Sequence, residues 1–118
     1  MQVWVVDDES GILQVIEAVL LNAGHEVRTF SNVASLDQMI ASDRPDAPDL
    51  LLIDARLGGE SGLETAERLR REVESFSHVV IMSGDSEVAD TIPPTIKWLR
   101  KPFRLDQLLQ LLDALDSA

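Results

Sequence analysis

The chain has 118 residues, which suits one domain, and its 10 Lys and Arg residues against 21 Asp and Glu residues give a formal net charge of −11. This acidic balance disfavours direct binding to nucleic acid or to an anionic membrane surface, whereas a hydrophobic content of 45% indicates a folded domain and not a disordered acidic tail. The absence of cysteine excludes disulfides and thiol catalysis and agrees with a cytoplasmic location. Two histidines are too few to favour a zinc site, and no apolar run approaches the roughly 18–20 residues of a membrane-spanning helix.

Short apolar runs alternate with longer amphipathic patterns along the chain. The runs at 3–6, 50–53 and 79–82 are continuously apolar, which is typical of strands buried on both faces of a parallel sheet. Weaker, mixed runs at 27–30 and 96–99 are expected to form the edge strands. Amphipathic patterns predict helices between them, in chain order around 10–24, 33–40, 63–73, 86–91 and 105–115.

The first helix has the clearest predicted ends, because Ser10 is placed to cap its start and Gly24 to end it. Its apolar stripe comprises Ile12, Val15, Ile16, Val19, Leu20 and Ala23. The stripes of the other long helices are Val33, Leu36 and Ile40, then Leu63, Ala66, Leu69 and Val73, then Leu105, Leu108, Leu112 and Leu115, the last broadened by Leu109 and Leu111. The fourth helix is limited to one or two turns, since Pro93 and Pro94 follow it.

The regular alternation of strand and helix predicts an α/β fold with a parallel sheet and helices on both of its faces. Five strands favour the flavodoxin-like, doubly wound order 2-1-3-4-5 over the six-stranded dinucleotide-binding order. We expect the whole chain, residues 1–118, to form this single domain.

Polar residues stand where four of the predicted strands end. The first strand stops at 7–9 (Asp-Asp-Glu), the third at Asp54, the fourth at Ser83 and the fifth at Lys101. Ligands of open α/β sheets bind at this edge. Two carboxylates about 4 Å apart repel by about 4 kcal/mol at an effective dielectric near 20, so such a cluster needs a cation or raised carboxyl pKa values. Oxygen ligands of this kind suit Mg²⁺, and a lysine and a hydroxyl beside them suit a phosphoryl group.

These motifs together resemble the signature of receiver domains of two-component response regulators. The residues that carry the resemblance are Val5-Val6-Asp7-Asp8-Glu9, Leu52-Ile53-Asp54, Met82-Ser83-Gly84 and Lys101-Pro102-Phe103, in the family's order over essentially the whole chain. The resemblance implies that Asp54 accepts a phosphoryl group from the phosphohistidine of a histidine kinase or a histidine phosphotransfer domain. It implies dependence on Mg²⁺ or Mn²⁺, and a signalling module that modifies itself without being a turnover enzyme.

The resemblance also assigns the metal ligands. Asp8 and the Asp54 carboxylate would bind the ion directly, the backbone carbonyl of Arg56 would be a third ligand, and Asp7 would act through water. An output domain or partner protein would receive the signal, with no binding of nucleic acid or membrane by this domain itself.

Further roles follow from the same resemblance. Lys101 would pair with the phosphoryl group, Ser83 would hydrogen-bond to it, and the Lys101–Pro102 peptide bond would be cis. Repositioning of Ser83 would let Trp98 turn inward. The surface of the fourth helix, fifth strand and fifth helix would then switch between two states.

The segment after Asp54 departs from the family pattern, since Arg56 stands two residues beyond it and Leu57-Gly58-Gly59-Glu60-Ser61-Gly62 replaces the usual hydrophobic-proline turn. Arg56 is expected to pair with Asp85 or with the phosphoryl group, and to alter the lifetime of the aspartyl phosphate.

Two other functions stay open at this point. One is a phosphatase that uses an aspartate nucleophile, although that class needs a second acid where this chain has Arg56. The other is a pseudo-receiver, a binding module that is not phosphorylated, although such modules usually lack one of Asp8, Asp54 or Lys101. A nucleotide or flavin binder is disfavoured, because no glycine-rich loop follows the first strand.

Overall fold

A central parallel sheet organises the protein, whose computed structural model describes residues 1–72 and 76–116. Its strands are β1 (Gln2–Val6), β2 (Glu26–Phe30), β3 (Leu50–Asp54), β6 (His78–Ser83) and β7 (Lys97–Arg100), in the spatial order β2-β1-β3-β6-β7. Numbered along the chain, this is the predicted order 2-1-3-4-5. Two further strands, β4 (Arg56–Leu57) and β5 (Glu60–Ser61), form a small antiparallel hairpin that the sequence analysis did not predict.

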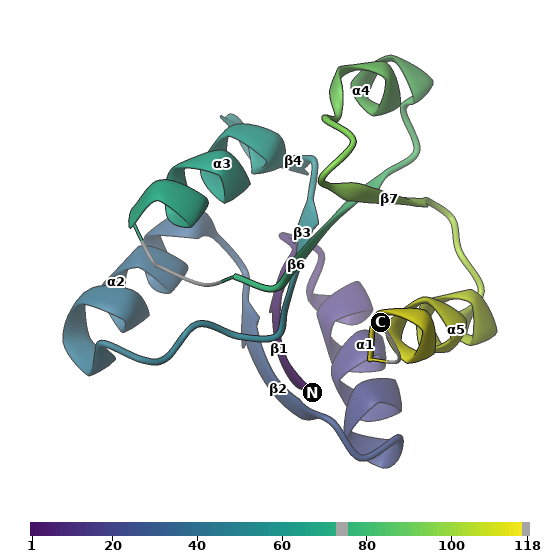
Figure 1. Cartoon of the computed structure of the whole chain (residues 1–118), viewed down its shortest axis with the longest axis horizontal. Coiled ribbons are helices and arrows are strands. Elements are labelled where there is room, and N and C mark those ends of the chain that lie inside the picture. The colour runs from purple at the N-terminus through teal and green to yellow at the C-terminus, as the bar shows by residue number, and fades with distance from the viewer. Residues whose placement is uncertain (73–75, 117–118) are drawn as a thin grey trace.

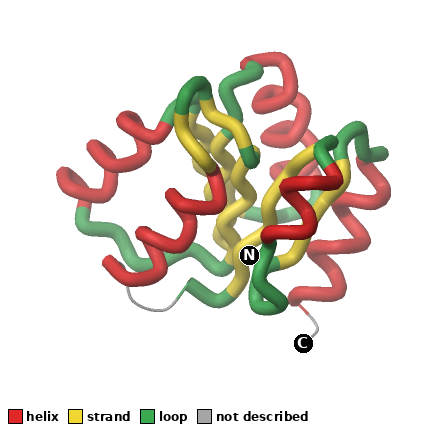
Figure 2. The backbone as a smooth tube through the Cα atoms, turned by 90° about the horizontal axis from the view of Figure 1, so that it is seen from above, coloured by secondary structure: helices red, strands yellow, loops and turns green. Residues whose placement is uncertain are grey.

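Helices cover both faces of the sheet. They are α1 (Ser10–Asn22), α2 (Val33–Asp43), α3 (Gly62–Glu72), α4 (Ser86–Thr91) and α5 (Leu105–Asp116). Helices α2 and α3 lie on one side of the strands and α1 and α5 on the other, with the short α4 standing apart from both pairs (Figures 1 and 2). The predicted α/β fold is therefore confirmed, and the fourth helix spans the two turns that the following prolines allow.

Each face of the sheet has its own hydrophobic core, because successive side chains of a buried strand point to opposite sides of the sheet. Trp4 and Val6 of β1 pack with α2 and α3, whereas Val3 and Val5 pack with α1 and α5. Trp4 is 3% exposed, and its ring makes an edge contact with Phe30 at 6.4 Å between centroids. The site-bearing strands β1, β3 and β6 are held between these two cores.

Two details of α1 differ from the prediction. Glu9, not Ser10, is the N-cap residue, and its side chain makes no capping hydrogen bond. Val15 is 48% exposed, because the helix packs through Leu13, Ile16 and Leu20, whose spacing of three and four residues defines a face that excludes it. Gly24 follows the helix end with a φ of +93°, as its predicted role as a terminator requires.

The last helix largely follows its predicted stripe. Leu108, Leu112 and Leu115 are buried, but Leu105 in the first turn is 41% exposed. Leu109 and Leu111 pack at the margin of the α1–α5 core. The predicted stripe position at residue 73, on the third long helix, lies outside the described residues. Over the described ranges, no helix combines the length and apolarity needed to cross a bilayer.

Candidate functional site

The carboxyl ends of four neighbouring strands bring the predicted site residues together. Asp7 directly follows β1, Asp54 ends β3, Ser83 ends β6 and Lys101 directly follows β7. Parallel pairing in register places these ends at one edge, since Val6 pairs with Ile53 and Asp54 with Met82. Asp7, Asp54 and Ser83 are all buried, which is unusual for polar side chains that lack partners.

Lys101 joins the two buried carboxylates. Its Nζ donates to Asp7 Oδ2 at 2.8 Å and to Asp54 Oδ2 at 2.9 Å, across sequence separations of 94 and 47 residues. Burial acts to lower the pKa of Lys101, but the hydrogen bonds to Asp7 and Asp54 outweigh it and raise that pKa above its ordinary value. The ammonium group is therefore charged at neutral pH and acts as the counterion of the carboxylates.

The three predicted acids could hold a divalent cation together. One carboxylate oxygen each of Asp7, Asp8 and Asp54 lie within 4.8 Å of one another. Three carboxylates and one ammonium leave a formal charge of −2 at the edge of the sheet. All the donors are hard oxygen atoms, and Asp8 is exposed to solvent, so the set fits Mg²⁺ or Mn²⁺, which retain water ligands.

Backbone contacts fix the carboxylates in these positions. The amide of Glu9 donates to Asp7 Oδ1 at 2.9 Å, and the amide of Arg56 donates to Asp54 Oδ1 at 3.2 Å. Gly62 starts α3 against the same strand end, where an added Cβ would lie 1.8 Å from the Asp54 carbonyl oxygen. Only glycine allows the start of α3 to approach the backbone of Asp54 so closely.

Ser83 and Trp98, the two residues of the predicted switch, are joined by a hydrogen bond. The indole Nε1 of Trp98 donates to the Ser83 carbonyl oxygen at 2.9 Å, and the amide of Lys101 donates to the same oxygen at 3.0 Å. The Ser83 hydroxyl oxygen accepts from the Asp85 amide at 3.0 Å. Trp98 is half-buried, and the Lys101–Pro102 peptide bond is cis, as predicted. The movement of Ser83 and Trp98 stays a prediction.

Comparison with known proteins agrees with this geometry. The family model described as response regulator receiver domain matches residues 3–113. The chain belongs to the response regulator receiver family. It is 33% identical over 115 residues to the DNA-binding transcriptional regulator NtrC of Escherichia coli strain K12, and 34% identical over 119 residues to the response regulator MprA of Mycobacterium avium.

Solved structures of receiver domains share the fold over nearly the full chain. The receiver domain of NtrX from Brucella abortus superimposes with a TM-score of 0.79 at 26% identity, over 98% of this chain and 99% of that one. The curated relatives are longer: the match covers 94% of this chain but 24% of NtrC, and 98% of this chain but 50% of MprA. The present chain thus spans about a quarter to a half of these relatives.

The receiver's hairpin is the feature that sequence reasoning missed. Gly58 adopts a φ of +63° at its tip, and its amide donates to Asp8 Oδ2 at 3.2 Å, so the hairpin contacts a proposed metal ligand. The Gly58-Gly59 pair is a typical turn signal of tight hairpins and could have revealed it. The hairpin strands have only two residues each, which is too short for an alternating apolar pattern.

Arg56 pairs with Asp85, one of the two partners that the sequence left open. Its Nη2 lies 2.8 Å from Asp85 Oδ2, with the Arg56 side chain 75% exposed and that of Asp85 34% exposed. This contact bridges the loop after β3 and the start of α4. The effect of Arg56 on the lifetime of an aspartyl phosphate stays a prediction.

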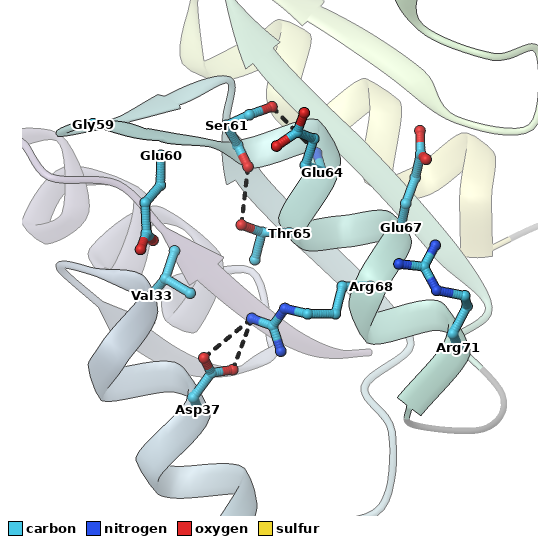
Figure 3. Close-up of a pocket in the computed structure, with 10 residues that line it drawn as sticks. All are labelled: Val33, Asp37, Gly59, Glu60, Ser61, Glu64, Thr65, Glu67, Arg68 and Arg71. Atoms are coloured by element: carbon cyan, nitrogen blue, oxygen red, sulfur yellow. Dashed lines mark hydrogen bonds and ion pairs between the residues drawn. The ribbon is translucent and has the colours of Figure 1, made fainter.

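A separate polar cleft lies between α2 and α3 (Figure 3). Arg68 Nη2 of α3 donates to both carboxylate oxygens of Asp37 of α2, at 3.0 and 3.1 Å. Burial acts to lower the pKa of Arg68, but the bond to Asp37 raises it. Thr65 is buried in the cleft, and its hydroxyl donates to the Ser61 carbonyl oxygen at 2.9 Å. This cleft joins α2, α3 and the hairpin and contains none of the proposed phosphoryl-transfer residues.

Proposed function

We propose that Asp54 is the phosphoacceptor of this receiver domain. The observation that carries the proposal is the position of its carboxylate: at the end of β3, beside two further carboxylates and 2.9 Å from the Lys101 ammonium. An Asp54 oxygen attacks the phosphorus of a phosphohistidine, a P–O bond forms, the P–N bond breaks, and its electron pair stays on the imidazole. The product is an acyl phosphate on Asp54.

Two residues around Asp54, Lys101 and Ser83, have distinct roles in this step. Lys101 can reach a phosphoryl oxygen with the same Nζ that now joins Asp7 and Asp54, and so offsets the charge that arrives. The Ser83 hydroxyl turns from the Asp85 amide to donate to a second phosphoryl oxygen. Water attack on phosphorus later releases inorganic phosphate and restores the carboxylate.

We propose that Asp8 and Asp54 bind Mg²⁺ or Mn²⁺ directly, with the Arg56 carbonyl as a third ligand and Asp7 acting through water. The bound ion would supply positive charge next to the phosphoryl oxygens. The fit of the oxygen donors and the net charge of the cluster support this assignment.

The phosphodonor is proposed to be a histidine kinase or a histidine phosphotransfer domain, docked beside the acceptor. An apolar groove of about 620 Å³ opens next to Lys101, between α1 and the segment that follows β7. Val15 and Leu105 line it and are 48% and 41% exposed, so it offers apolar surface to a partner that must reach Asp54. Because this groove is continuous with the site, we propose that a helix of the partner lies in it and presents the phosphohistidine to Asp54.

Docking is tested by transfer from a phosphorylated histidine-kinase core domain. We expect Val15→Asp to slow this transfer by tenfold or more while phosphorylation by acetyl phosphate stays unchanged. Leu21→Asp is the matched control, because Leu21 is on the same helix and 53% exposed but is not part of the groove. Equal slowing by the two variants would contradict the docking site.

The phosphoacceptor assignment is tested by intact mass. We expect incubation with Mg²⁺ and acetyl phosphate to add one phosphoryl group that is lost in base, and EDTA to prevent it. Asp54→Asn should abolish the adduct, whereas Asp43→Asn, a change of an exposed acid in α2, should leave it unchanged. No adduct on the unaltered protein, or an adduct that persists in Asp54→Asn, contradicts the assignment.

The wider role is proposed from the relatives. NtrC is a DNA-binding transcriptional regulator, which favours a cytoplasmic location for the present domain as well. We propose that residues 1–118 act as one signalling domain without turnover of a separate substrate, and that an output domain or partner protein reads its state. The net charge of −11 argues against nucleic-acid or membrane binding by this domain itself.

A phosphatase-like enzyme is not favoured by the site. Enzymes with an aspartate nucleophile would need an acid two residues after Asp54, but Arg56 stands there and pairs with Asp85. A pseudo-receiver is not favoured either, because Asp8, Asp54 and Lys101 are all present and close together.

A further inference from the structure

Helix α4 is weakly held in this structure. It has six residues, none of them buried, and only Val88 and the following Ile92 pack at the edge of the α2–α3 core. A groove of about 330 Å³ is lined by residues of the hairpin, by Leu63 of α3 and by Val88 and Thr91 of α4. So short a helix with so little buried apolar surface depends on its end contacts for its position.

Asp85 makes three such contacts at the start of α4. One carboxylate oxygen, Oδ1, caps the helix by accepting from the Glu87 amide at 2.8 Å. The other, Oδ2, accepts from Arg56 Nη2 at 2.8 Å, across the groove from the hairpin. The amide of Asp85 donates to Ser83 Oγ at 3.0 Å. The helix cap, the hairpin and Ser83 are thus joined through one residue.

On the hairpin side, Arg56 makes a similar pair of contacts, one through its backbone amide and one through its side chain. Its amide donates to Asp54 Oδ1 at 3.2 Å, while its guanidinium group holds Asp85. The two members of the ion pair therefore each contact a side-chain oxygen of the active site through their backbone amides, Asp54 Oδ1 and Ser83 Oγ. A chemical change at either oxygen acts directly on one end of the ion pair.

We propose that the Arg56–Asp85 ion pair is a latch that holds α4 in its unphosphorylated position, and that phosphorylation of Asp54 opens it. This inference rests on the proposed phosphoacceptor role of Asp54. A phosphoryl dianion beside Arg56 competes with the single carboxylate of Asp85 for its guanidinium group and repels that carboxylate. At the same time Ser83 Oγ turns towards the phosphoryl group and releases the Asp85 amide.

The latch is a weak one, which suits a reversible switch. Exposed ion pairs contribute about 0.2–1 kcal/mol, so loss of this pair changes the ratio of closed to open α4 by about 1.4- to fivefold. Such a shift is measurable as hydrogen exchange at the amides of residues 86–92, because these amides exchange through the open state.

The first test needs no phosphorylation. We expect Arg56→Gln to raise amide exchange of residues 86–92 about 1.4- to fivefold, whereas Arg28→Gln, which breaks the exposed Arg28–Asp43 pair between β2 and α2, leaves it unchanged. Asp85→Asn keeps a good capping side chain but loses the charge, so it should match Arg56→Gln. The double variant should exchange no faster than either single variant.

The second test compares the phosphorylated proteins, with the adduct counted by intact mass. We expect acetyl phosphate with Mg²⁺ to raise α4 exchange in the unaltered protein at least to the level of Arg56→Gln, and to raise it by a smaller factor in Arg56→Gln, where only the Ser83–Asp85 contact remains to be lost. Unchanged exchange in unphosphorylated Arg56→Gln, or an equal increase on phosphorylation in both proteins, overturns the latch. Absence of the adduct overturns the proposed phosphoacceptor function instead, while the first test still decides whether the ion pair holds α4.

Discussion

Removal of the Lys101 ammonium is the most direct perturbation of the site. Lys101→Met keeps the length and apolar character of the side chain but leaves Asp7 and Asp54 without their shared counterion. The Asp7 side chain is 0% exposed and that of Asp54 12% exposed, so water cannot replace the lost contacts. The formal charge of the cluster changes from −2 to −3.

The expected cost is large for a single substitution. Breaking a buried ion pair by removing one partner costs about 3–5 kcal/mol, and the 18% exposure of the Lys101 side chain places this case near 3 kcal/mol. For a domain of this size, that loss lowers the thermal midpoint by about 10 °C. Urea unfolding at pH 7 without divalent cations would measure it as a lower midpoint at an unchanged m-value.

Two variants separate the electrostatic cause from general damage. Lys97→Met, at an exposed position and the one other lysine, should change the unfolding free energy by no more than about 0.5 kcal/mol. Asp7→Asn combined with Lys101→Met removes the most deeply buried of the uncompensated charges, returns the formal charge of the cluster to −2 and should recover at least about 1 kcal/mol relative to Lys101→Met alone. A loss below about 1 kcal/mol for Lys101→Met, or no recovery in the double variant, would refute the counterion role.

Three further predictions concern the same edge of the sheet. Because the folded-state pKa of Lys101 is raised above its ordinary value of 10.5, its contribution to stability is complete below that pH and is lost as the pH rises through the raised value. The chain has no tyrosine or cysteine to titrate there, so an unfolding free energy that stays flat on the alkaline side would contradict the ion pairs. Gly62→Ala would place a methyl group 1.8 Å from a β3 carbonyl oxygen, so it should lower the free energy of unfolding by about 2–3 kcal/mol. Gly11→Ala, with nothing within 4 Å of the added Cβ, should not lower that free energy in the same denaturation assay. Trp98→Phe loses the bond to the Ser83 carbonyl and should destabilise the protein by about 1 kcal/mol, and equal urea midpoints would argue against that bond in solution.

Local pattern was sufficient for the strands and helices of the main sheet, but not for the β4–β5 hairpin. The runs at 50–53 and 79–82 are apolar at every position because both faces of their strands are buried, and that composition is readable without knowing any neighbour. The two prolines at 93–94 limited α4 to its six residues for an equally local reason, since proline disfavours helical backbone before it. The ends of the apolar runs also located the acids, because these acids directly follow the predicted strands.

The apolar periodicity of α1 predicted less reliably which of its residues are buried. Val15 belongs to the predicted stripe of α1 but is exposed, because α1 packs through Leu13, Ile16 and Leu20. Which part of an apolar stripe is buried depends on the neighbouring elements, here the sheet and α5. The exposed Val15 is now part of the proposed docking groove.

The residues at the carboxyl ends of the strands could be read from the sequence, because strand boundaries depend on local burial and backbone preference. How those residues pair became visible only in the folded chain. Lys101 bridges Asp7 and Asp54 over separations of 94 and 47 residues, and Arg56 reaches Asp85 across a separation of 29. Such contacts depend on which strands are neighbours and on how closely α3 approaches β3, distances through space that no local pattern of residues specifies.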